Sequence, residues 1–295
     1  STTVYTVTVT VGTGTTCSST DQVTVTVNPV PTADAGLDKE ICDGGTVPIG
    51  GTPTSTTTGV TYSWTPVAGL MNATLPNPDA SPAATTVYTV VVTETATGCT
   101  ASDQVVVTVN SLPNVNAGAD QSICGVGSVT IGGSPTGPLN SNYQWLPTAG
   151  LSNATASNPM ASPLSTTTYT VTVTDLNGCT NTDQVTVTVE TVPVADAGAD
   201  QFICNGDSRQ IGGSPTGPGG ASYSWTPTAG LLDATVANPI ASPAATVTYT
   251  VVVTATNGCT SMDDVTVTVN PLPSADAGPD LTICDQASTP IGGMP

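Results

Sequence analysis

The spacing of the eight cysteines is the feature that most constrains this chain. They lie at positions 17, 42, 99, 124, 179, 204, 259 and 284, so a short interval alternates regularly with one about twice as long. Trp64, Trp145 and Trp225 recur with the same overall period. A fixed period of this length indicates tandem repeats, in which one supersecondary unit recurs. The 295 residues therefore divide into three complete units and a partial unit at each end: 1–28, 29–110, 111–190, 191–270 and 271–295.

Each unit reads as a succession of short β-strands, rich in the β-branched residues valine and threonine that favour this structure. In the third unit a segment at 195–203 leads into a cysteine turn, then to a strand ending in Ile-Gly-Gly and to a Tyr-x-Trp strand. A stretch rich in Asn-Pro and Ser-Pro predicts bends and an edge strand. The unit closes with a hairpin, which in the second copy pairs 169–174 with 183–189 around Asn177-Gly178, a strong hairpin signal.

This order of strands predicts an all-β chain of tandem immunoglobulin-like β-sandwiches in an extended array. About seven strands in each unit, an inward tryptophan on the third and a tyrosine opening the penultimate strand are typical of that fold. Tyr88, Tyr169 and Tyr249 occupy the position of its tyrosine corner. Two residues later each unit has a valine where an antibody domain has its inter-sheet cysteine (Val90, Val171 and Val251). We therefore expect the core to close by packing and the cysteines to act elsewhere.

Composition excludes several classes of function. The chain has 2 basic and 21 acidic residues, no histidine and a formal net charge of -19. Nucleic-acid surfaces and anionic membranes require clustered lysine and arginine, and catalytic triads require histidine. No apolar run approaches the ~20 residues of a transmembrane helix. The sequence therefore predicts no enzyme, no cofactor, no nucleic-acid partner and no membrane insertion in this segment.

The repeat motif carries a family resemblance. The pattern ADAGxDxxIC…IGG…YxW…NGCTxxDxVTVTV runs through the three complete units and, in part, through both partial ones. It resembles the polycystic-kidney-disease (PKD)-like and Ig-like repeats of very long surface proteins in Bacteroidota, including gliding-motility adhesins exported by the type IX system. The resemblance implies a secreted protein at the cell surface, engaged in cell adhesion, whose neighbours are further repeats of the same chain and lateral copies in a fibre.

Two disulfide patterns are compatible with the repeat. The preferred one joins the first turn of one domain to the last hairpin of the next, because these elements face each other across a junction: Cys42 with Cys179 and Cys124 with Cys259. The in-domain alternative remains open, since small exported domains often contain a disulfide: Cys42 with Cys99, Cys124 with Cys179 and Cys204 with Cys259. A strand length of ~25 Å would separate the in-domain partners, whereas a disulfide needs Cα atoms within about 7 Å.

A third pattern, which pairs the cysteines at the two ends of each short interval, is excluded by reach. The chain from Cys99 to Cys124 runs down one strand, through a linker and down another, at ~3.3 Å per residue. The two sulfur atoms would therefore lie too far apart to form a bond.

In the preferred inter-domain pattern Cys17, Cys99, Cys204 and Cys284 would pair with repeats outside this sequence or stay unmatched. Because both ends of the sequence fall inside a unit, we interpret it as a window from a longer array.

Aspartates recur near the start of every unit. Asp38, Asp120, Asp200 and Asp280 hold equivalent positions, and they are candidate calcium ligands because calcium takes six to eight oxygens and PKD-like repeats can carry the ion. We favour a structural role, since aspartate ends strands and forms turns. The second unit also has Asn116 where the other copies have an earlier aspartate.

The preferred function is therefore the structural repeat region of a secreted extracellular fibre or adhesin stalk, acting as a disulfide-stabilised spacer. The alternative is a glycan- or protein-binding module of a surface adhesin. In that hypothesis the ligand, such as a surface glycan, would bind the loops before the Tyr-x-Trp strands, at 52–61, 134–142 and 214–222. These loops are small and polar in all three copies, which favours the spacer.

Overall fold

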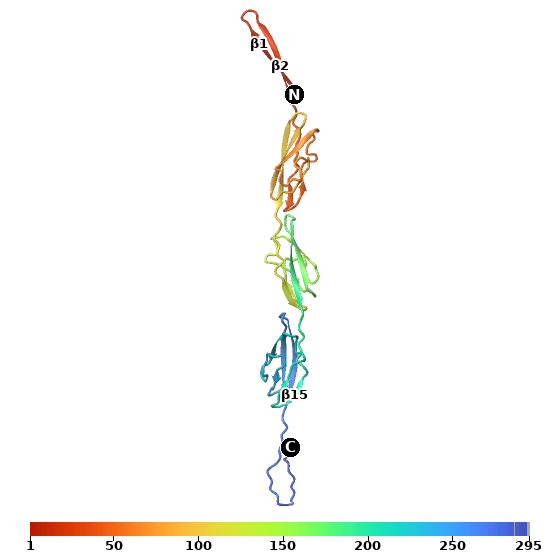
Figure 1. The fold of residues 1–295 in the computed structure, drawn as a ribbon, viewed down its shortest axis with the longest axis vertical. Helices are drawn as coiled ribbons and strands as arrows, with labels where there is room; N and C mark the ends of the chain where they lie inside the picture. The colour runs from red at the N-terminus through yellow and green to blue at the C-terminus, as the bar shows by residue number, and fades with distance from the viewer. Residues whose placement is uncertain (286, 294–295) are drawn as a thin grey trace.

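The computed structural model describes residues 1–285 and 287–293. Every regular element in these residues is a β-strand, and none of them forms a helix able to span a membrane. The units follow one another along a single long axis, so the molecule is a rod rather than a globule (Figure 1). The predicted fold class, an extended array of tandem Ig-like β-sandwiches, is confirmed.

Three complete units contain the same six strands. The first has β3 (Lys39–Cys42), β4 (Val47–Pro48), β5 (Val60–Thr65), β6 (Asp79–Ala80), β7 (Thr86–Glu94) and β8 (Thr100–Asn110). The second has β9 (Gln121–Cys124), β10 (Val129–Thr130), β11 (Asn142–Leu146), β12 (Met160–Ala161), β13 (Thr167–Thr174) and β14 (Thr180–Glu190). The third has β15 (Gln201–Cys204), β16 (Arg209–Gln210), β17 (Ser222–Thr226), β18 (Ile240–Ala241), β19 (Val247–Thr254) and β20 (Thr260–Asn270). A separate hairpin of β1 (Thr3–Val11) and β2 (Cys17–Val25) precedes them.

Each complete unit packs a four-stranded sheet against a two-stranded one. In the second unit the larger sheet has the order β11-β13-β14-β9 and the smaller sheet pairs β10 with β12. The short first strand β9 runs parallel to the last strand β14, and the other pairs are antiparallel. The unit therefore has six strands, and the expectation of about seven was too high.

The first strand is shorter than the sequence pattern predicts because a glycine bends the chain. Of the segment 195–203, only its last three residues lie in β15. Gly198 has a φ of +81°, and a Cβ added there would lie 2.9 Å from the carbonyl oxygen of Gly212. Before this bend, the carbonyls of Ala197 and Asp196 accept hydrogen bonds from the amides of Gly212 and Gly213, respectively. The segment thus bonds first to the glycines that follow β16 and then, as β15, pairs with β20.

The last hairpin forms as predicted, with a longer loop than an Asn-Gly pair alone would give. Strands β13 and β14 pair from Thr167 with Val187 to Thr174 with Thr180, which leaves a five-residue loop at 175–179. The amide of Asp175 donates to the carbonyl of Cys179 at 3.0 Å, and Gly178 has a φ of +80°. Gly178 therefore takes the left-handed position that a glycine in such a loop commonly fills.

The core of each unit is built around its tryptophan. Trp145 and Tyr169 are fully buried between the sheets with Val171, and the indole N–H donates to the carbonyl of Ala156 at 3.0 Å. The Tyr169 hydroxyl donates to the carbonyl of Ala149 at 2.8 Å, and burial raises the pKa of this phenol. That carbonyl lies 20 residues upstream, so the tyrosine fixes the loop after the tryptophan strand. In a tyrosine corner the hydroxyl bonds to backbone only a few residues upstream, so Tyr169 has the position of that motif but a more distant partner.

Candidate functional site at the repeat junctions

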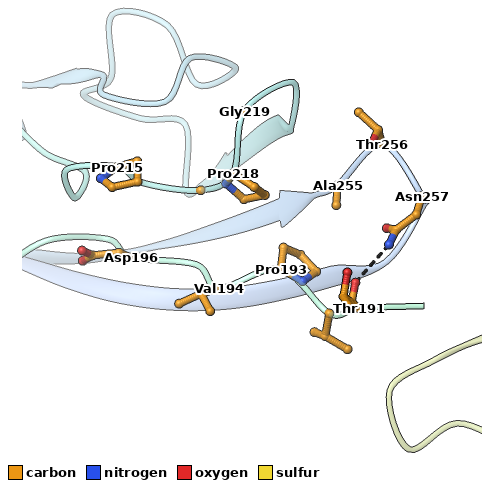
Figure 2. Close-up of a pocket in the computed structure, with 12 residues that line it drawn as sticks. Thr191, Pro193, Val194, Asp196, Pro215, Pro218, Gly219, Ala255, Thr256 and Asn257 are labelled. Carbon is orange, nitrogen blue, oxygen red and sulfur yellow. Dashed lines mark hydrogen bonds between the residues drawn. The ribbon is translucent and has the colours of Figure 1, made fainter. Parts of the chain in front are cut away.

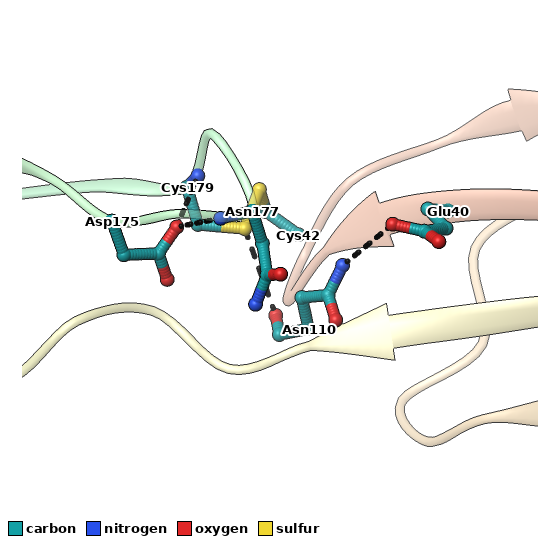
Figure 3. The surroundings of a disulfide bond; sticks show 6 residues. All are labelled: Glu40, Cys42, Asn110, Asp175, Asn177 and Cys179. Carbon is teal, nitrogen blue, oxygen red and sulfur yellow. Dashed lines mark hydrogen bonds between the residues drawn. A yellow bond between two sulfur atoms is a disulfide. The ribbon is translucent and has the colours of Figure 1, made fainter. Parts of the chain in front are cut away.

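A disulfide crosses the junction between the first and second complete units (Figure 3). Cys42 is the last residue of β3, and its register partner on β8 is Asn110, the last residue of that strand. Cys179 ends the hairpin loop of the second unit and is fully buried. The two Cα atoms are 5.6 Å apart, a normal distance for a disulfide. The parallel pairing of β3 with β8 is what places Cys42 at the end of its domain that faces the next hairpin.

Neighbouring side chains hold this hairpin in place. One carboxylate oxygen of Asp175 accepts the amides of Asn177 and Cys179, both at 2.9 Å. On the other side of the junction the Asn110 side chain donates to Glu40 at 3.4 Å, linking the ends of β8 and β3 (Figure 3). The Cys179 sulfur lies 4.0 Å from the Asn110 carbonyl, a packing contact because a disulfide sulfur carries no proton.

The junction between the second and third units has an equivalent disulfide, but different side chains form the hydrogen bonds around it. Cys124 is bonded to Cys259 with the same Cα separation of 5.6 Å. Here Asn257 takes over the capping role, accepting the Cys259 amide at 3.1 Å. Its amide nitrogen also donates across the junction, to Glu190 at 3.3 Å and to the carbonyl of Thr191 at 3.0 Å. The sequence reasoning missed these caps, although their positions two or four residues before each hairpin cysteine were visible.

In the structure the cysteines follow the inter-domain pattern. Cys42 is bonded to Cys179 and Cys124 to Cys259, while Cys99 and Cys204, which the in-domain alternative would use, have free thiols. Cys17 and Cys284 are also free within the described part of the chain. Cys17, Cys204 and Cys284 are exposed and Cys99 is partly exposed, so all four remain accessible to a further partner.

The recurring aspartates bind backbone amides inside their own units. Asp38, Asp120 and Asp200 each accept an amide of the last strand, from Val106, Thr186 and Thr266, at 2.8 to 2.9 Å. Asp280 belongs to the partial C-terminal unit, whose sequence stops before that strand. Asn116 accepts the amide of Gly118 at 2.9 Å, as Asp196 does for Gly198 at 2.8 Å, so this position needs an oxygen rather than a charge.

A second aspartate in each unit holds the first segment against the last strand. Asp103, Asp183 and Asp263 accept the amides of Ala35, Ala117 and Ala197 at 2.8 Å, and these alanines are fully buried. The described residues contain no group of three or more acidic or cysteine side chains placed to hold a metal ion. The four candidate calcium ligands are thus not part of such a group in the described part of the chain.

The substitution Asp183→Ala is expected to lower the free energy of unfolding by about 1 to 3 kcal/mol, because it leaves the buried amide of Ala117 without an acceptor. Asp183→Asn keeps an acceptor oxygen and should lose less than half as much. Denaturant unfolding followed by tryptophan fluorescence measures both. Equal losses for the two variants would show that the charge, and not the hydrogen bond, is what the position provides.

An open pocket of about 630 Å³ lies beside the second junction (Figure 2). It is lined by the linker at 191–194, the loop at Pro215–Gly219 and the hairpin loop Ala255–Asn257, with Asp196 as its one acidic residue. The Asn257 to Thr191 hydrogen bond closes one end of it (Figure 2). In the second unit Leu139 and Leu176 occupy the positions of Gly219 and Thr256. The lining therefore differs between copies, and a ligand site here would belong to this junction alone.

Comparisons with known proteins find likeness in shape only. No family model matches the sequence, and no curated protein sequence matches it. A three-Ig structure of titin, an E-to-A mutated variant, is 11% identical, with 82% of this chain and 100% of that chain covered and a TM-score of 0.41. The N-terminal eight Ig domains of Down Syndrome Cell Adhesion Molecule are 14% identical, with 86% and 38% covered and a TM-score of 0.46. Likeness at this level does not extend to function.

Proposed function

We propose that this chain is the structural repeat region of a secreted extracellular fibre or adhesin stalk, in which it acts as a disulfide-stabilised spacer. The observation that carries the proposal is the disulfide across each junction between complete units. Tandem domains joined by one linker are free to move relative to each other unless their interface is large. Here each junction has two covalent connections, the backbone linker and the disulfide, so the units cannot swing apart.

Disulfide chemistry and charge support an extracellular location. Disulfides persist in oxidising environments such as the cell surface and are rare in the cytosol. The net charge of -19 spread along a rod creates mutual repulsion, which keeps the array extended and soluble. The resemblance of the repeat to those of Bacteroidota surface proteins agrees with this location. The partners in this proposal are further repeats of the same chain, with lateral copies in a fibre.

Imaging of the oxidised chain tests the spacer directly. Negative-stain electron micrographs should show straight rods in which the units are collinear, and reduction of the disulfides should broaden the distribution of angles between neighbouring units. The Cys99→Ser variant, which removes a free thiol, is the matched control and should give the same straight rods as the parent. Compact or freely bent particles under oxidising conditions would contradict the proposal.

The spacer needs no bound metal, because the recurring aspartates already accept backbone amides. We therefore expect the melting temperature to be the same within about 1 °C in millimolar calcium and in excess chelator, since binding too weak to change the free energy of unfolding leaves the midpoint in place. Differential scanning calorimetry measures this, with magnesium as the control for ionic strength. A rise of several degrees with calcium alone would instead support the calcium hypothesis for Asp38, Asp120, Asp200 and Asp280.

The pocket at the second junction favours the binding module as a second candidate function. It contains part of the loop at 214–222, and Val194 on its wall is 79% exposed. A glycan array or a screen against extracellular proteins would reveal such a ligand. Binding that is lost in Val194→Asp but kept in Val126→Asp, at a valine that is 89% exposed and outside the pocket, would place the ligand in the pocket. If neither the glycan array nor the protein screen gave binding, the binding-module hypothesis would be contradicted and the spacer function would remain.

A further inference from the structure

We infer that tension along the array is carried by two covalent paths that bypass, in every complete unit, the segment between its first turn and its last hairpin. The first path runs from Cys17 to Cys42, crosses the disulfide to Cys179 and continues to Cys204. The second runs from Cys99 to Cys124, crosses to Cys259 and continues to Cys284. Each backbone section of either path is one short cysteine interval. The inference rests on the covalent connectivity and not on the proposed role of the protein.

The backbone sections of both paths are already extended in the folded state. Three of them consist of the last strand of one unit, a linker without helix, and the short first strand of the next, as in β8 followed by β9. The section from Cys259 to Cys284 has the last strand β20 followed by chain without a regular element. Strand residues advance ~3.3 Å each, and a fully stretched chain reaches at most ~3.6 Å per residue. Apart from the bend at the glycine of each linker, pulling on these sections therefore yields little additional length.

The two paths lie side by side and are hydrogen-bonded to each other in every complete unit. Strand β3 of the first path pairs in parallel with β8 of the second, and β9 of the second pairs with β14 of the first. Strand β15 of the first path pairs with β20 of the second. The registers match: Cys42, Cys124 and Cys204 are opposite Asn110, Glu190 and Asn270, respectively. Every complete unit thus contains one pair of neighbouring strands, one strand from each path.

The remaining residues of each unit lie off both paths. The segments 43–98, 125–178 and 205–258 contain all three tryptophans and the buried tyrosines. Without disulfides, unfolding of one unit would release about 80 residues, or ~290 Å at ~3.6 Å per residue. With the disulfides in place, tension does not pass through the off-path segments, so their unfolding adds no length to the array. The disulfides therefore convert a chain of extensible domains into one of nearly fixed length.

Single-molecule stretching between Cys17 and Cys204 tests this inference. Both residues are exposed free thiols, so they accept maleimide-linked DNA handles once Cys99 and Cys284 are replaced by serine. The first path between the handles has about 50 residues, so the oxidised protein should reach a limiting length of ~180 Å at ~3.6 Å per residue. Along the sequence the two thiols are about 187 residues apart, so after reduction the limit should rise to ~670 Å.

Two double variants separate the paths. Cys42→Ser with Cys179→Ser cuts the first path, and the shortest remaining route through Cys124 and Cys259 has about 162 residues, or ~580 Å. Cys124→Ser with Cys259→Ser leaves the first path intact and should keep the ~180 Å limit. The readout is the length of the stretched chain, and non-reducing peptide mapping of each variant verifies that its remaining disulfide has formed. Extension of the oxidised parent well beyond the limit set by the first path, or equal limits for the two double variants, would overturn the inference.

Discussion

The double substitution Cys42→Ser and Cys179→Ser is expected to lower the free energy of unfolding by about 4 to 5 kcal/mol. This disulfide closes a loop of 137 residues, and a cross-link of that span removes much of the conformational freedom of the unfolded chain. Both cysteines are replaced together so that neither leaves a thiol able to mispair. Denaturant unfolding followed by tryptophan fluorescence, at constant protein concentration, measures the change.

The matched control for this disulfide is the pair Cys99→Ser and Cys204→Ser. These residues have free thiols in the structure, so serine there should alter the free energy of unfolding by no more than about 0.5 kcal/mol. Non-reducing peptide mapping of the parent provides an independent check, and it should recover a linked Cys42/Cys179 peptide. If the control were destabilised as strongly as the Cys42/Cys179 variant, the in-domain pairs would be the ones that form, because each double variant would then break two of them.

Replacement of Trp145 by alanine is expected to destabilise the second unit by about 3 to 5 kcal/mol. The side chain is fully buried, and its loss also leaves the carbonyl of Ala156 without its donor. A unit of this size has a total stability of roughly 4 to 12 kcal/mol, so the substitution removes at least about a quarter of it, and hydrogen exchange should rise in the second unit while its neighbours keep their rates. Hydrogen exchange resolved by peptide measures this, because the other units serve as internal references.

Leu146→Ala is the control for the tryptophan. Leu146 is the next residue of the same strand, it points to the opposite face, and it is 53% exposed. Its truncation should change exchange in the second unit by less than about fivefold, which corresponds to roughly 1 kcal/mol. If instead exchange rose equally in all three units after Trp145→Ala, the units would fold as one cooperative block and not one by one.

Periodicity made most of the fold predictable. The Tyr-x-Trp strands and the closing hairpins alternate buried and exposed residues, so their positions and faces follow from the sequence alone. The first strand was overestimated because Gly198 was read as part of a strand, whereas its positive φ bends the chain before β15 begins. The partner of Tyr169 was not predictable, because the carbonyl of Ala149 belongs to an irregular loop whose path depends on tertiary packing.

At the junctions, the sequence predicted the disulfide pairing, which follows from the topology, but not the hydrogen bonds around it. Knowing which end of a sandwich each turn occupies was enough to favour Cys42 with Cys179 over pairs within a domain. The caps at Asp175 and Asn257 were missed because a carboxylate and an amide fill the same role in different copies. Three of the four aspartates read as candidate calcium ligands accept backbone amides of the last strand, because the first segment lies beside that strand, a long-range pairing that no local pattern reveals.

The nearest-neighbour bonding of the cysteines also bears on how such a protein can evolve. Every complete unit contributes one cysteine from its first turn and one from its last hairpin, and in both junctions the bond reaches only the adjacent unit. Duplication or deletion of one whole unit by recombination within the gene therefore leaves each interior cysteine with a partner of the right kind. Lineages can lengthen or shorten the array one whole unit at a time without passing through a form that has mismatched thiols.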